Sequence, residues 1–336
     1  MRFSDQLISG TPVTGSPGQY TFFVPFGTHD IEIRTFVRPG TTTNPTAFRS
    51  HYGTGRISGI NVPGQGSTPV PVQMNQAGDT SANPFLIFNE TELRKVGRGV
   101  ANPQGFQHWT LDRHYKLMAN ITLTGGDWEP IGDIVNFFTG SFNGGWFNIS
   151  GLTINNTTLS ESGMFAENSG TIENLNLPGA NSTQNMMFGS HGVVAGLNNG
   201  TVRNINVSGN MSQLAQGVMG GVVGQNNIGG TVENSSFTGT INNDGSSGGV
   251  VGLNMGAVTR SRSSGTINDV SGQAGGVVGV NDTPSSTVTN SHSSSTVIAS
   301  QGVGGVVGWN TGTVQNVFFQ AVFPATLLLV EWLEIT

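Results

Sequence analysis

The chain of 336 residues contains no cysteine, and only 10% of its residues are charged. Without cysteine, disulfides and thiolate metal sites are excluded, and the redox compartment is left open. Lysine is absent between residues 161 and 320, where three arginines stand against seven acidic residues. No basic stripe is available there for phosphate groups, so we predict no nucleic-acid partner.

Long apolar runs are also missing. No run reaches the ~20 residues that a membrane helix needs, so we predict no membrane span. The N-terminal stretch MRFSDQLISG lacks the apolar core of a signal peptide. Either a leader has been removed or export uses another route.

Glycine, by contrast, is abundant, at 51 of 336 residues. Glycine and asparagine suit tight corners, where the backbone needs a positive φ. A glycine-rich composition is also seen in disordered chains, but these have few aromatic residues. Here 19 Phe and 5 Trp are present, which favours a folded chain.

One seven-residue phrase recurs along the second half of the chain, as GGVVGQN, GGVVGLN, GGVVGVN and GGVVGWN. With two weaker copies before it, the closing asparagine recurs every 27–30 residues, a period typical of stacked repeats. We predict that these side chains stack as a structural ladder along the repeat axis. The predicted ladder consists of Asn168, Asn198, Asn226, Asn254, Asn281 and Asn310.

Each repeat holds two or three short β-branched runs separated by Gly, Asn and Ser, which is a strand pattern and not a helical one. A single repeat cannot bury its own apolar face, so repeats must stack. The predicted fold is therefore all-β: a right-handed parallel β-helix, or solenoid. Two columns should face inward, one four residues before each ladder asparagine (Val250, for example) and one in the following strand (Val258).

The rest of the chain differs from the repeats. Residues 1–82 read as a small β-sandwich-like module, and 83–320 as the parallel β-helix. A short capping helix is predicted near 89–96, since Asn89 can cap it, acids come early and bases late.

Residues 321–336, AVFPATLLLVEWLEIT, form an apolar C-terminal segment. We predict that it either caps the last turn or contacts another subunit, because a bare solenoid end exposes strand edges. The candidate contact residues are Leu327, Leu329, Trp332 and Leu333.

Sites for chemistry are weak in this sequence. The glycine-rich loop GVGGVVG lies in a repeat and is not followed by Lys-Ser/Thr, so it does not indicate a nucleotide site. The pair His108 and His114 lacks further ligands, and the acidic group Asp127, Glu129 and Asp133 lies on a loop-like segment. We therefore predict no catalytic residue, no metal and no cofactor.

Several phrases occur in a fixed order: FLIFNETELRKVG, YKLMANITL, WEPIG, FTGSFNG, ISGLTINN, SGMFAENSGTIENL and GGVVGQN. In this order the chain, over about 85–320, resembles bacterial surface proteins with GLUG repeats. That family includes the non-catalytic β-helical region of streptococcal immunoglobulin A peptidases and adhesin-like proteins. The chain departs from the family at Asn120 and Thr122, where acidic residues are usual. The resemblance implies export, surface display and binding, but no single ligand.

The prediction for function is a non-enzymatic extracellular or cell-surface protein: adhesive, or a stalk or filament subunit. Its partners would be other copies of the chain, joined head to tail, or a glycan or protein ligand on a host or surface. The alternative is a carbohydrate-active enzyme, a polysaccharide lyase or hydrolase built on a β-helix, because many β-helical proteins act on polysaccharides.

Overall fold

A computed structural model of the chain describes residues 78–99, 106, 108–156 and 159–320, together with six strand segments between Arg2 and Val62. The predicted segment 321–336, with Leu327, Leu329, Trp332 and Leu333, lies outside the described residues. Near the N-terminus, four strands form an antiparallel sheet in the order β2-β1-β5-β6, and β3 pairs with β4. Their bounds are β1 Arg2–Phe3, β2 Gln6–Leu7, β3 Thr11–Pro12, β4 Tyr20–Thr21, β5 Gly27–Ile33 and β6 Gly55–Val62.

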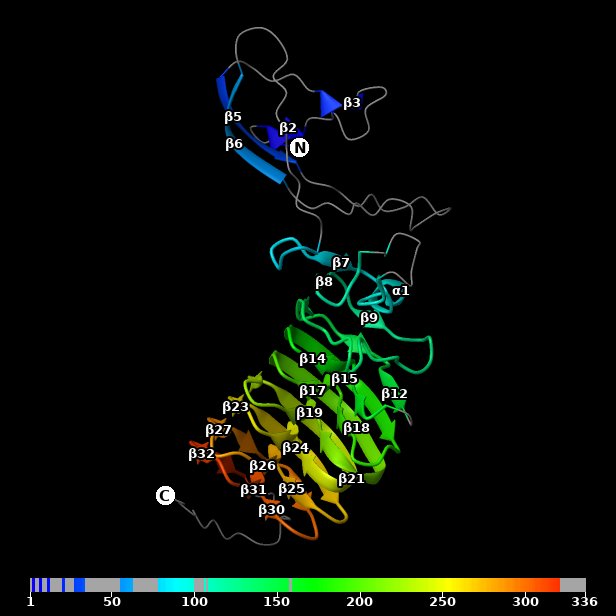
Figure 1. Ribbon diagram of the computed structural model, residues 1–336, viewed down its shortest axis with the longest axis vertical. Coiled ribbons are helices and arrows are strands. Elements are labelled where there is room, and N and C mark those ends of the chain that lie inside the picture. Colours follow the sequence, from blue (N-terminus) through cyan, green and yellow to red (C-terminus); the bar gives the residue numbers. More distant parts are fainter. Residues whose placement is uncertain are drawn as a thin grey trace.

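From Phe85 onward the chain coils into a parallel β-solenoid of about 8 turns, so the predicted fold class is confirmed (Figure 1). Each strand pairs in parallel with the strand about one repeat later, as in Val223–Asn226 on Val251–Asn254. This anchor sheet contains β14 Phe165–Asn168, β17 Ala195–Asn198, β19 Val223–Asn226, β22 Val251–Asn254, β26 Val278–Asn281 and β31 Val307–Asn310.

A second line of strands, here called the threonine sheet, follows the anchor sheet in each turn. It stacks β7 Phe85–Ile87, β8 His114–Leu117, β10 Ser141–Asn143, the first residues of β15 Thr171–Gln184 and of β18 Thr201–Gly220, β20 Thr231–Glu233, β23 Ala257–Thr259, β27 Thr287–Thr289 and β32 Thr313–Gln315. Beside it, β9 Ile121–Thr122 pairs with β11 Ile149–Ser150.

The long strands β15 and β18 bend around corners and also pair with the strands that complete each turn. On the next side these are β12 Thr153–Asn156, β21 Ser236–Gly248, β24 Arg262–Asp269, β28 His292–Ser293, β29 Thr296–Ile298 and β33 Phe318–Phe319. On the last side they are β13 Glu161–Ser162, β16 Ser190–Gly192, β25 Gln273–Gly275 and β30 Val303–Gly304. One bend requires glycine: a Cβ on Gly239 would collide with the carbonyl oxygen of Gly209 in the turn before it.

The two predicted inward columns form the core of the repeats. In the first column Met164, Val194, Val222, Val250 and Val277 are fully buried, and Val306 is 7% exposed. In the second, Ile172, Val202, Val232, Val258 and Val288 are fully buried, whereas Val314 in the last described turn is only partly buried. These column assignments are confirmed, and the end of the stack accounts for Val314, because no described strand covers it.

A different kind of core fills the first turns. Phe85 stacks on Trp109 with ring centroids 5.0 Å apart, and Phe106 meets the same indole edge-on at 5.0 Å. Tyr115 and Phe138 continue this aromatic packing toward the first repeats. Helix α1, Glu90–Leu93, lies at this end of the solenoid (Figure 1).

Helix α1 is shorter than the predicted 89–96. Asn89 caps it, since its side chain accepts a hydrogen bond of 3.0 Å from the Glu92 backbone N–H, and the Glu92 carboxylate accepts one of 2.7 Å from the Phe88 backbone N–H. Beyond Arg94 the hydrogen bonds tighten, as in Lys95 to the Glu92 carbonyl, and they form turns instead of a longer helix.

Candidate functional site

The ladder asparagines stack on the anchor sheet. The Nδ2 of each donates to the Oδ1 of the next over 2.7–2.8 Å, from Asn168 through to Asn310. The first five side chains are fully buried, while Asn310 at the end is exposed. Their amide groups also bond corner carbonyls, such as that of Gly200 with Asn198. Every amide is thus held by backbone or by another rung, which leaves it no free geometry for a ligand.

A second asparagine column turns the corner after the threonine sheet. These residues have positive φ, which asparagine tolerates better than most residues. The column comprises Asn174 (φ 55°), Asn204 (58°), Asn234 (44°), Arg260 (50°), Asn290 (51°) and Asn316 (53°). Neighbouring amides bond each other, as in Asn204 Nδ2 to Asn174 Oδ1 at 2.8 Å. The positive φ of these corner positions explains the asparagines, so no ligand is needed to account for them.

One charged column runs along the threonine sheet. The register places Glu173, Arg203 and Glu233 side by side on three consecutive turns. Arg203 Nε donates to Glu173 Oε2 at 2.8 Å, whereas Glu233 pairs with Arg260. The arginine therefore binds one carboxylate instead of bridging two.

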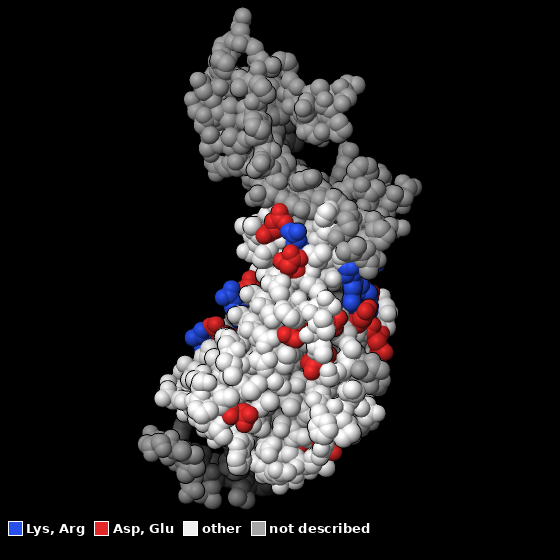
Figure 2. Space-filling model, in the orientation of Figure 1, with Lys and Arg blue, Asp and Glu red and all other residues white. Residues whose placement is uncertain are grey.

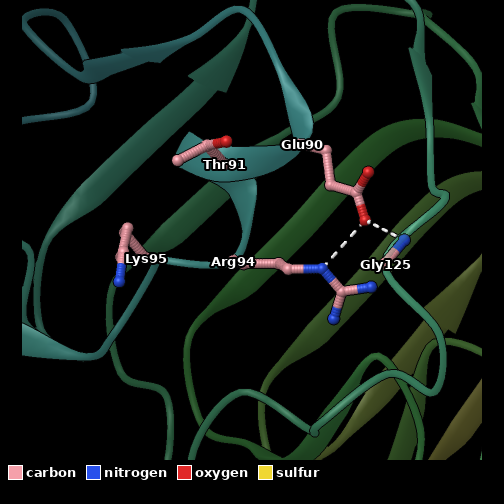
Figure 3. A pocket seen from close by; sticks show the side chains of 5 residues that line it. All are labelled: Glu90, Thr91, Arg94, Lys95 and Gly125. Atoms are coloured by element: carbon pink, nitrogen blue, oxygen red, sulfur yellow. Dashed lines mark hydrogen bonds and ion pairs between the residues drawn. The ribbon is translucent and has the colours of Figure 1, made fainter. Parts of the chain in front are cut away.

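The cap helix and the first turns enclose a shallow hollow of about 340 Å³, lined by Glu90, Thr91, Arg94, Lys95 and Gly125 (Figure 3). The Glu90 carboxylate accepts hydrogen bonds of 2.9 Å from the backbone N–H groups of Thr124 and Gly125 and from Arg94 Nε. Burial alone would raise the pKa of Glu90, but these donors outweigh it and lower the pKa to about 2. These contacts of Glu90 with Arg94, Thr124 and Gly125, here called the fastener, hold the cap helix to the next turn. The hydrogen bonds of the fastener occupy the Glu90 carboxylate.

Sequence reasoning missed this fastener because its partners lie 34 and 35 residues apart along the chain. The helix signal at Glu90 was visible, but nothing local indicated which loop the carboxylate would reach. Arg94 completes the contact by placing its guanidinium 5.3 Å from the ring centre of Trp128.

The acidic residues considered for catalysis have structural partners. Asp127 Oδ1 accepts from Asn155 at 2.9 Å, and Glu129 pairs with Arg98 at 3.1 Å. Asp133 accepts from the backbone of Asn136 at 2.6 Å, and this contact lowers its pKa although burial opposes the shift. Contacts within the chain therefore account for all three carboxylates.

The histidines do not gather either. His114 Nδ1 lies 2.7 Å from Ser141 Oγ, a contact between adjacent turns. In the part of the chain that the structure describes, no three His, Asp or Glu side chains come close enough to hold a metal ion. The described helices include none with the length and apolar character of a membrane span.

Polar side chains are buried where β15, β18, β21 and β24 end. His191 is fully buried without a hydrogen-bond partner for either ring nitrogen, and burial lowers its pKa to about 4. Three turns on, burial raises the pKa of Asp269, although Ser247 Oγ donates to it at 2.5 Å and the Gly272 N–H at 2.7 Å. Sequence reasoning missed both, since the equivalent positions carry other residue types in the neighbouring turns, such as Met219 beside His191 and Asn243 beside Asp269.

Charged groups are sparse on the body of the solenoid. On the face shown in Figure 2, basic groups lie in the upper half of the described body, near acidic ones, and most of the remaining surface is uncharged.

Comparison with known proteins supports this fold. Residues 215–242 match the model of the GLUG motif, which confirms the predicted resemblance. In solved structures, the solenoid is similar to a protein from Bacteroides ovatus described as a candidate immunoglobulin A1 protease. The TM-score is 0.53 and the identity 19%, over 72% of this chain and 76% of that one. At that identity the likeness concerns the fold.

Two curated relatives share part of the sequence. Halomucin of Haloquadratum walsbyi is 33% identical over 161 residues, which is 44% of this chain and 2% of halomucin. A protein of Evansella cellulosilytica named as a Gly-rich membrane protein is 34% identical over 131 residues, 38% of this chain and 15% of that protein. The chain therefore spans only a small part of the length of these relatives.

Proposed function

We propose that the chain is a non-catalytic, rod-forming part of an extracellular or cell-surface protein that binds through its exposed side chains. The observation that carries the proposal is that the polar groups form hydrogen bonds and ion pairs within the solenoid. The ladder amides and the acids Asp127 and Glu129 are engaged by neighbouring turns, so they hold the rod together. A stack of turns gives a long body whose exposed face recognises partners.

The relatives agree with this setting. The GLUG motif, a relative named as a membrane protein and a neighbour described as a protease of immunoglobulin A1 all favour a surface or extracellular location. Adhesion, stalk formation and head-to-tail self-association remain parts of the proposal, and so does the absence of catalysis.

Surface location is tested on intact cells of the source organism with antibodies against the full chain and with added protease. The proposal expects labelling of intact cells and loss of the label after proteolysis. Label that appears only after the cells are broken would contradict it.

Catalysis is tested separately, by incubating the full chain with a panel of polysaccharides and analysing the products. The proposal expects no new reducing ends and no unsaturated products. Reproducible turnover would favour the carbohydrate-active enzyme instead.

A further inference from the structure

One corner of the solenoid breaks the asparagine rule. Trp146 has φ 63°, and its backbone N–H donates 2.8 Å to the carbonyl oxygen of Asn174, the first positive-φ asparagine of the next turn. The register places Gly144, not Trp146, at the start of the corner column, since the Gly144 N–H donates 2.8 Å to the Glu173 carbonyl oxygen. Trp146 lies two residues further on, among extra residues that the next turn lacks. A bulky residue in the left-handed region is an outlier that the surrounding structure must hold in place.

The indole of this residue is not used in the core. Trp146 is 54% exposed, whereas Trp109 and Trp128 in the first turns are 3% and 4% exposed. Met118, at the same corner one turn earlier, is also 39% exposed. A strained and solvent-facing tryptophan has no packing role that would explain it.

An amide column begins directly beside this tryptophan. Asn176 Nδ2 donates 2.7 Å to the Trp146 carbonyl, Asn206 Nδ2 donates 2.9 Å to Asn176 Oδ1, and Ser236 Oγ donates 2.8 Å to Asn206 Oδ1. In the other direction Asn148 pairs in parallel with Asn176. Asn148 and Asn206 are exposed, so the column presents amide donors and acceptors to solvent along the solenoid axis.

These groups carry no formal charge. On the other side of the corner, the nearest charged column has Glu173 paired with Arg203, and Lys116 is its one exposed cation on the early turns. An aromatic face next to uncharged amides matches a sugar ring, which offers apolar C–H groups on its faces and hydroxyls at its rim. Stacked turns repeat every ~4.8 Å, close to the length of one sugar unit in an extended β-linked chain.

We propose that Trp146 and the amide column of Asn148, Asn176 and Asn206 form a binding site for a neutral polysaccharide. One sugar ring stacks on the indole, and the following units run along the axis, with their hydroxyls bonded to the exposed amides. This names the partner of the proposed surface rod and so rests on that proposal for its setting, while the binding itself is measured on the purified chain.

The test uses affinity electrophoresis of the full chain in gels that contain hydroxyethyl cellulose, xyloglucan, glucomannan or dextran. The decisive variant is Trp146→Asn, because asparagine tolerates the positive φ of this position better than most residues. It should leave the unfolding temperature unchanged or raise it, and weaken binding about tenfold or more, as expected when ring stacking is lost. Trp146→Phe should retain part of the binding, and Trp309→Ala, which removes another exposed indole, should retain all of it.

Binding to a neutral polysaccharide that Trp146→Asn loses without loss of stability supports the site. The inference is overturned if none of the four polysaccharides retards the wild-type chain, or if Trp146→Asn binds as well as wild type. Retardation only by polygalacturonate, a charged polysaccharide, would overturn it too. All of these failures leave surface labelling of intact cells unaffected, so they are distinguishable from failure of the proposed function.

Discussion

The first turns and the later turns of this solenoid solve the same packing problem with different side chains. Between Phe85 and Phe165 the core is filled by aromatic rings with centroids 4.9–6.3 Å apart, at angles that differ from pair to pair. Between Val194 and Val288 it is filled by columns of valine beside a buried asparagine ladder. In the repeats, identical side chains stack from one turn to the next. The first turn of the solenoid has no turn before it, and large aromatic side chains close the core there.

This difference determines how many neighbouring residues a destabilising substitution affects. In the valine region each side chain has an equivalent above and below, so one defect disturbs two neighbouring turns. In the aromatic region one ring touches several others, and the fastener at Glu90 ties the cap to a single loop. Five substitutions or changes of pH probe this contrast.

The largest effect is expected from a charge in the valine columns. Val250→Asp places a carboxylate at a fully buried position with no donor prepared for it, and should cost about 3–5 kcal/mol of unfolding free energy. Leu253→Asp, in the half-buried outward column of the same turn, is the matched control and should cost far less. Urea unfolding measures both, and equal losses would contradict the inward assignment of Val250.

Acid should act next, through His191. Its folded pKa of about 4 lies below the ordinary value of 6.5, so the unfolded chain binds the proton first. Stability is then complete above pH 6.5 and falls by up to about 3 kcal/mol as the pH drops toward 4. Met219 occupies the same column in the next turn, so His191→Met should fold and remove this slope. Unfolding curves of both proteins between pH 8 and 4 check it, and identical slopes would exclude His191 as the cause.

The asparagine ladder comes third. Asn226→Ala removes two ladder bonds, so the buried Asn198 Nδ2 loses an acceptor and the buried Asn254 Oδ1 loses a donor, which should cost about 2–3 kcal/mol. Asn310→Ala, at the exposed end of the same ladder, should cost less than about 1 kcal/mol. Thermal unfolding of the two variants gives the comparison. Equal losses of stability in the two variants would show that burial does not determine the contribution of the ladder bonds.

The sequence predicted the repeats well because periodicity carries the information. The interval between asparagines fixes the register, and the register fixes which valines face inward, so Val250 and Val258 were placed without a structure. The first turns were harder, because Trp109 packs on Phe85 and Tyr115 although its separation from them in the chain does not match the repeat period.

Candidate sites were predictable only where they repeat. The corner asparagines recur along the sequence with the period of the repeats, but Trp146 lies among extra residues in the turn before the first clear repeat, where no period applies. The buried His191 was missed for a different reason: its column carries Met219, Ser247 and Ala274 in the following turns, so no shared residue type marks it in the sequence. Both Trp146 and His191 depart from the residue types that the repeat carries. Such positions are the hardest to predict from the sequence, because periodicity gives no information about them.

The cap fastener should respond to acid in a lower range than His191. The folded pKa of Glu90 is about 2, below its ordinary 4.5, so its contribution is present above pH 4.5 and is lost as the pH falls toward 2. Glu90→Gln at pH 7 should cost about 1–2 kcal/mol, because three charge-assisted hydrogen bonds are weakened. Glu129→Gln removes the carboxylate of a largely exposed ion pair and serves as control. Hydrogen exchange at Thr124 and Gly125 reads the fastener locally, and unchanged protection in Glu90→Gln would show that the cap is held by its aromatic core alone.

The smallest effect is expected from the charged column on the outside of the repeats. Arg203 is 47% exposed and its ion pair with Glu173 lies on the surface, so Arg203→Gln should cost no more than about 1 kcal/mol. That cost should shrink further in 0.5 M salt, which screens exposed charges. Arg260→Gln removes the partner of Glu233, which lies in the same column one turn after Arg203. Because Arg260 has a φ of 50°, this substitution also changes the conformational free energy of the backbone, which salt does not affect. Thermal unfolding at low and high salt separates the two contributions. A loss at Arg203 that is large and indifferent to salt would mean that this column supports the rod as the asparagine ladder does, and the distinction between a structural interior and a free outer face would no longer hold there.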